Sequence, residues 1–108
     1  MYNMTEKDIL KLTYDEIQNL MNNTIDCYER INHCQAWFND ALYLNKRVCF
    51  IKSYNTVVAL YCYDNQKLYS VGKFSMTTYQ HIRKYKNNYT PNKHNTKEIN
   101  LELCNWFK

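Results

Sequence analysis

The residues best suited to chemistry lie in one short segment, FSMTTYQHIRKY, at residues 74–85. A hydroxyl nucleophile needs a base within hydrogen-bond reach and a third group that orients that base. Ser75 and His81 are six residues apart and would point in different directions on a helix, whereas Thr78 and His81 are close enough to touch. No Asp or Glu lies in the segment to orient the histidine. We therefore predict no catalytic residue: the hydroxyls would cap a helix, and His81 would bond a neighbouring hydroxyl or a backbone carbonyl.

Cysteine and histidine come close together in the sequence at Cys27, His33 and Cys34. Their spacing does not match the paired-ligand loops of structural zinc sites, so we predict no metal site and no cofactor. The five cysteines are Cys27, Cys34, Cys49, Cys62 and Cys104. The odd count and the lack of any C-x-x-C pair favour free thiols in a reducing cytosol. The start of the chain is polar, and the longest apolar run is far shorter than a membrane span, so we expect a cytoplasmic protein.

Charge divides the chain into an acidic and a basic part, although the net charge is only +4. Residues 1–45 carry three Lys or Arg and seven Asp or Glu, and residues 46–108 carry eleven and three. This asymmetry suggests two differently charged faces. The candidate partner-binding acids are Asp8, Asp15, Glu16, Asp26 and Glu29. They would mimic phosphates against a basic groove, or they would simply form a solvated helix face. The candidate nucleic-acid-binding cations are Arg83, Lys84, Lys86, Lys93 and Lys97.

The sequence predicts helices in the N-terminal part of the chain and strands after them, and these elements position the candidate residues. Thr13 and Glu16 have capping-box spacing before an apolar face, which predicts a helix at about 14–23. The apolar residues that follow predict further helix up to Asn45, with a break near Asn22–Asn23. Alternating Val, Ile, Phe and Tyr then predict strands around 48–52, 57–63 and 68–73. A turn at 64–67 would join the last two as a hairpin.

A second helix is predicted from Ser75 to about Asn88, ended by Pro91. A polar connection follows, and a short helix is favoured over a strand for the segment from Ile99 onward. The prediction is one α+β domain over residues 1–108, with N-terminal helices packed on a three-stranded antiparallel sheet that is followed by a basic helix. Residues 1–45 would be mainly helical and acidic, 46–90 the sheet and basic helix, and 91–108 a polar loop and short C-terminal element.

The segment IKSYNTVVALYCYDNQKLYSVGKFSMTTYQHIRKY carries a motif of the form SYxTxVA…LY…G..S.TT..HI, which covers about a third of the chain. The motif positions are Ser53, Tyr54, Thr56, Val58, Ala59, Leu68, Tyr69, Gly72, Ser75, Thr77, Thr78, His81 and Ile82, with Tyr85 at a position that tends to be Phe. It resembles small, mostly uncharacterised proteins of phages and mobile elements of low-GC Gram-positive bacteria. Some proteins with similar small domains look like inhibitors of bacterial defence, including anti-CRISPR proteins.

This resemblance implies a non-enzymatic, phage-encoded inhibitor that binds and blocks a host defence protein, with a CRISPR effector nuclease or its nucleoprotein complex as the expected partner. The alternative is a small basic regulator that binds nucleic acid through the cations listed above. Tyrosines interleaved with those cations would then stack on bases. Charge reversal of either face, combined with a salt titration, separates the two hypotheses.

Overall fold

A single mixed sheet of six strands organises the computed structural model, which describes residues 5–22, 29–31, 34–54, 56–71, 75–91 and 94–101. The strands lie side by side in chain order: β1 (Glu29–Arg30), β2 (Ala36–Tyr43), β3 (Lys46–Ser53), β4 (Thr56–Cys62), β5 (Lys67–Val71) and β6 (Lys97–Leu101). Neighbouring strands are antiparallel except β5 and β6, which are parallel. Helix α3 (Met76–Tyr89) lies between β5 and β6 in the chain, as a parallel connection requires.

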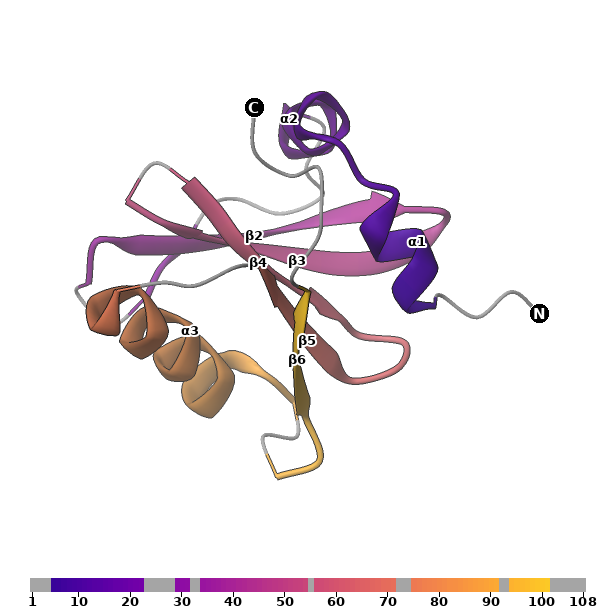
Figure 1. Cartoon of the computed structure of the whole chain (residues 1–108). Coiled ribbons are helices and arrows are strands. Elements are labelled where there is room, and N and C mark those ends of the chain that lie inside the picture. The colour runs from indigo at the N-terminus through magenta and orange to yellow at the C-terminus, as the bar shows by residue number, and fades with distance from the viewer. Residues whose placement is uncertain are drawn as a thin grey trace.

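The sheet is covered on both faces. Figure 1 shows the short helices α1 (Glu6–Leu10) and α2 (Tyr14–Asn22) on one side and α3 on the other. Strand β3 contributes side chains to the core on both faces of the sheet, because alternate side chains of a strand point to opposite faces. Val48 and Phe50 pack in the core with α1 and α2, whereas Cys49 and Ile51 pack in the core with α3. Among the described residues, no helix is long and apolar enough to cross a bilayer.

Several predicted elements are confirmed, together with the α+β class. Helix α2 ends at Asn22, where the break was predicted, and the Glu16 amide donates to the Thr13 hydroxyl at 3.2 Å as a capping box requires. Strands β3, β4 and β5 and helix α3 fall within about two residues of their predicted ranges. Ser75 is the N-cap of α3 and accepts a hydrogen bond from the Thr78 amide. Gly72 of the motif lies outside the described residues.

The prediction of helix from residue 23 to Asn45 is wrong for the described residues, because β1 and β2 occupy this region. Trp37, Phe38 and Leu42 have a spacing that fits a helix and a strand equally well. The turn decides between them: Leu44 and Asn45 both have left-handed backbone, with φ of 53° and 61°. Two such residues form the type of hairpin turn that matches strand twist, so β2 folds back onto β3.

The three-stranded sheet is also wrong, since β1, β2 and β6 bring the total in the described chain to six strands. The prediction of a short helix from Ile99 onward is wrong for residues 99–101, because they belong to β6 (Lys97–Leu101), which lies beside β5. Ile99 and Leu101 alternate with polar residues and pack in the core with α1 and α2. Pairing with an existing strand therefore buries this segment better than a helix would. The remainder of the predicted helix, residues 102–108, lies outside the described part of the chain.

Candidate functional site

The motif residues that carry hydroxyl and imidazole groups meet where β3 ends and α3 begins. The Ser53 hydroxyl lies 2.8 Å from His81 Nδ1 and 3.3 Å from the Thr78 hydroxyl. The Ser75 hydroxyl in turn lies 3.4 Å from Thr78 Oγ1. The predicted bond from His81 to a neighbouring hydroxyl is therefore confirmed, but its partner is Ser53 rather than Thr78. We call Ser53, Ser75, Thr78 and His81 the hydroxyl–histidine cluster.

The hydroxyl–histidine cluster resembles a nucleophile and base in composition, but its serine–histidine pair is buried. Ser53 and His81 are only 3% and 5% exposed. Burial, with a smaller effect from the Lys84 charge, lowers the pKa of His81 and favours the neutral ring. The Tyr54 ring lies over the histidine, with 5.6 Å between ring centroids. This geometry favours a structural tie between β3 and α3 rather than a reaction centre. Sequence reasoning missed Ser53 as the partner, although the motif contains it.

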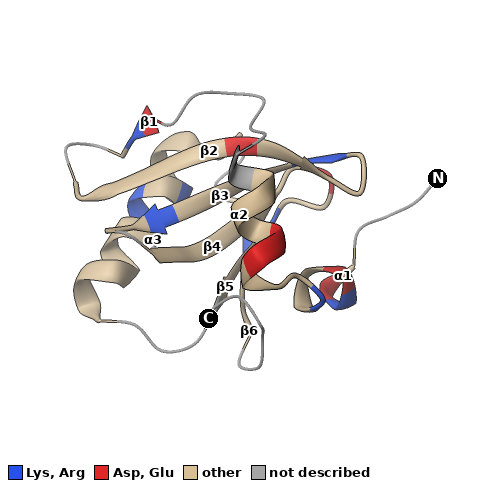
Figure 2. Cartoon of the chain, turned by 90° about the horizontal axis from the view of Figure 1, so that it is seen from above, with Lys and Arg blue, Asp and Glu red and all other residues tan. Residues whose placement is uncertain are grey.

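The candidate acidic residues do not gather on one face. Asp8 is buried and caps α1, where its carboxylate accepts from the Thr5 amide at 2.9 Å and the Thr5 hydroxyl at 3.1 Å. Asp15 and Glu16 are exposed in the first turn of α2, as acids at a helix N-terminus often are. Figure 2 shows this acidic end of α2 well apart from β1, which carries Glu29.

Asp26, the remaining candidate acid, lies outside the described residues. Lys7 and Lys11 interrupt the acidic charge around α1. Because Asp8 is committed to a cap, Asp15, Glu16 and Glu29 are the described members of the set available to a partner.

The candidate cations are divided between the two faces of the sheet. Arg83 and Lys84 are exposed on α3, and the Lys84 ammonium contacts the Cys34 sulfur at 3.1 Å. Lys86 forms an ion pair of 3.5 Å with Glu98. Leu68 on β5 aligns with Glu98 on β6 and packs under α3, so Glu98 points toward α3 and the adjacent Lys97 points away. Lys93 lies outside the described residues.

Helix α3 presents an outward row of three large side chains. Met76 is 73% exposed and Tyr79 is 40% exposed, and the exposed Arg83 completes the row. Their spacing of i, i+3 and i+7 places them along one side of the helix. We call Met76, Tyr79 and Arg83 the α3 row. Thr78, His81, Ile82 and Tyr85 occupy the buried side.

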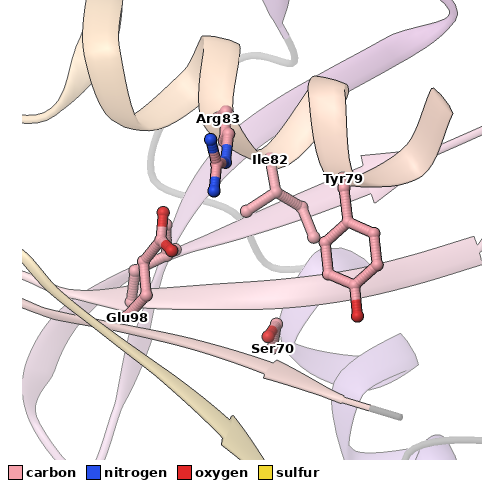
Figure 3. Close-up of a pocket in the computed structure, with 6 residues that line it drawn as sticks. Ser70, Tyr79, Ile82, Arg83 and Glu98 are labelled. Carbon is pink, nitrogen blue, oxygen red and sulfur yellow. The ribbon is translucent and has the colours of Figure 1, made fainter. Parts of the chain in front are cut away.

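A small pocket of about 100 Å³ opens between α3 and strands β5 and β6. Its lining residues are Leu68, Ser70, Tyr79, Ile82, Arg83 and Glu98. Figure 3 shows the Arg83 guanidinium and the Glu98 carboxylate pointing toward one another at one end, with the Tyr79 ring and the Ser70 hydroxyl toward the other. The Ser70 hydroxyl accepts a hydrogen bond of 3.3 Å from the Asn100 amide. We call this the α3–β6 pocket.

A second polar cluster, which sequence reasoning missed, joins β2, β3 and the end of β4. Both Arg47 Nε and the adjacent terminal nitrogen contact Asp40 Oδ2, and the Nε distance is 3.0 Å. The Tyr63 hydroxyl donates to the other Asp40 oxygen at 3.0 Å, and the guanidinium lies 5.2 Å from the Tyr63 ring centre. Burial raises the pKa of Tyr63, with a further contribution from Asp40. This cluster joins neighbouring strands of the sheet. Sequence reasoning missed it because Asp40 and Arg47 meet only through strand pairing, which sets Asp40 opposite Cys49 and makes Arg47 its diagonal neighbour.

Comparison with known proteins places these features in a family. Neither a curated protein nor a solved structure matches the chain. A family model described as a family of unknown function (DUF8033) matches residues 11–101. The matched span contains every element from α2 to β6, together with the hydroxyl–histidine cluster and the α3–β6 pocket. Because the model covers most of the chain, the protein belongs to this family of unknown function.

Proposed function

We propose that this protein is a non-enzymatic binding protein that blocks another protein through the α3 row. The observation that carries the proposal is the exposure of Met76 and Tyr79 beside Arg83 on one side of a well-anchored helix. Tyr, Met and Arg are the residue types enriched at protein interfaces. Burying a Met side chain contributes on the order of 1.5–3 kcal/mol. Such side chains contribute most to the free energy of binding when a partner removes them from water.

The partner class follows from the sequence resemblance to phage and mobile-element proteins. A host defence protein is the proposed target, and a CRISPR effector nuclease or its nucleoprotein complex is the first candidate. The proposed site of action is the bacterial cytoplasm. Asp15 and Glu16 lie on α2, across the sheet from the α3 row, so they would act on the partner only through long-range attraction, which affects association rate more than affinity. The buried Asp8 takes no part.

The test uses two neighbouring substitutions that introduce the same charge. Met76→Asp places a carboxylate in the α3 row, and Thr77→Asp places one on the next, exposed position of the same helix turn. Both acids are favourable near a helix N-terminus, so both variants should fold. Binding to purified CRISPR effector nucleases and inhibition of target cleavage are measured for each. Met76→Asp should weaken binding by about tenfold or more, which corresponds to roughly 1.4 kcal/mol.

Two results would contradict this proposal. Equal loss of binding by Met76→Asp and Thr77→Asp would show that charge alone, rather than the α3 row, governs the contact. Capture from a host lysate that yields only nucleic acid, and nothing after nuclease treatment, would reject the protein partner altogether.

A second candidate function is nucleic-acid binding. It is favoured by one specific observation: Arg83 and Lys84 are both exposed on α3, and Arg83 lines the same pocket as Tyr79. Cations of this kind bind phosphates by releasing counterions, so the affinity would fall steeply as salt is added. Replacing Arg83 and Lys84 by Glu should then abolish binding, whereas Asp15→Lys with Glu16→Lys should not.

A further inference from the structure

The α3–β6 pocket has room for one edge of a planar group and not for a whole nucleotide. Its volume of about 100 Å³ holds roughly three waters, and it is well below the range of about 300–1,000 Å³ typical of pockets for whole small molecules. A ligand would therefore insert one group and leave the rest outside. The inner walls are apolar, since Leu68 and Ile82 belong to the core under α3. A flat, mostly apolar group with polar edges suits such walls.

One end of the pocket combines a donor with an acceptor. Arg83 can only donate hydrogen bonds, and the ionised Glu98 can only accept them. The two groups point toward one another in Figure 3, but no ion pair joins them within the described part of the chain. Glu98 instead pairs with Lys86 through Oε1, which leaves lone pairs of the carboxylate available. A ligand edge that fits here must offer an acceptor to Arg83 and donors to Glu98.

Among the nucleobases, guanine has this edge. Its O6 is an acceptor, and the adjacent N1–H and N2–H₂ are donors that together satisfy both oxygens of a carboxylate. Uracil also offers an acceptor beside a donor, but its second carbonyl would face the carboxylate and be repelled. Adenine and cytosine place a donor where Arg83 needs an acceptor or lack the paired donors. The Tyr79 ring at the wall supplies the aromatic surface on which unpaired bases commonly stack.

We infer that the α3–β6 pocket binds a single unpaired guanine base, held by Arg83 and Glu98 against Tyr79. Lys86, which pairs with Glu98 beside the pocket, would lie near the phosphate that accompanies the base. The same chemistry is presented by a free guanine nucleotide and by an extruded guanine in single-stranded nucleic acid. This inference deepens the second candidate function and rests on it only for the oligonucleotide source.

The test measures binding of GMP, AMP, CMP and UMP, and of a short oligouridine with and without one central guanosine. GMP should bind more tightly than the other mononucleotides, and the guanosine should improve oligonucleotide binding by about tenfold or more. A GMP affinity equal to that of the oligonucleotide identifies the free nucleotide as the source. A tighter oligonucleotide with a strong salt dependence identifies single-stranded nucleic acid.

Three variants test whether the base binds in the α3–β6 pocket. Glu98→Gln removes the carboxylate acceptor, and Arg83→Lys keeps the charge but loses the guanidinium fork. Each should abolish the preference for guanine while other oligonucleotide binding persists. Both positions are exposed, so the folds should survive, and urea unfolding checks this. Met76→Asp lies outside the pocket and should leave the guanine preference unchanged.

Two outcomes overturn the inference. Equal binding of the two oligouridines, with salt-dependent affinity retained, would reject the guanine pocket and leave the second candidate function standing. A guanine preference that survives in folded Glu98→Gln and Arg83→Lys would place the base elsewhere. Absence of binding to every nucleotide and oligonucleotide would reject both the pocket and the nucleic-acid function.

Discussion

The substitution Ser53→Ala tests whether the hydroxyl–histidine cluster is a structural tie. Ser53 Oγ is 2.8 Å from His81 Nδ1, and both residues are buried. Removing the hydroxyl leaves the ring nitrogen without this partner in a place that water does not readily reach. Thr78 loses a contact of 3.3 Å but keeps Ser75 at 3.4 Å, so its loss is smaller. Only one atom is removed, and the cavity term is therefore minor.

The expected loss of folding stability follows from these contacts. A buried group left without its partner costs about 1–3 kcal/mol. We expect the free energy of unfolding to fall by about 2 kcal/mol, which moves the urea midpoint by about 1 M for an m-value of about 2 kcal/mol/M. The same change in a His81→Leu background should cost much less, because the histidine that Ser53 serves is already gone.

Urea unfolding followed by circular dichroism, on the four proteins of this double-mutant cycle, measures these values. Equal costs of Ser53→Ala in both backgrounds would refute the hydrogen bond as the source of stability. Binding provides an independent readout, since a buried tie should not contact a partner. A Ser53→Ala protein that remains folded but loses all partner or nucleotide binding would show that the cluster acts directly in function.

Three further predictions concern the core and its titration. Because the pKa of His81 is lowered in the fold, the unfolded chain binds the proton more readily; stability should fall as pH drops below about 6.5, and His81→Leu should remove this dependence in pH-dependent unfolding. Asn39 is buried on β2, and its side-chain amide makes no hydrogen bond within the described chain. Asn39→Leu should therefore raise the melting temperature and increase the free energy of unfolding by about 1 kcal/mol. Asp40→Ala removes the acceptor of Arg47 and Tyr63 and should cost about 2–3 kcal/mol in urea unfolding, whereas Asp40→Asn, which can still accept from Tyr63, should cost less.

Local sequence was sufficient to predict the helices and strands whose signals lie within a few residues of one another. The Thr13–Glu16 capping box and the apolar face behind it define α2, and Ser75 marks the start of α3. Short continuous apolar runs in β3 and β4 indicate strands whose two faces are both buried. These patterns also placed Arg83 and Lys84 on the outer side of α3, because helical spacing fixes which side chains face outward.

Tertiary structure decided the elements whose local pattern fits two conformations. The segment around Trp37 and Leu42 became β2 because the turn at Leu44–Asn45 lets it pair with β3, and Lys97–Leu101 became β6 because β5 offered an edge.

The same holds for the sites. Ser53 and His81 are 28 residues apart, and Arg83 and Glu98 share a pocket because one is on α3 and the other on the strand beneath it. Sequence spacing sets which residues are available within each element. Contacts between distant elements depend on strand register and helix packing, which are set by the burial of the whole core and cannot be read from any short segment.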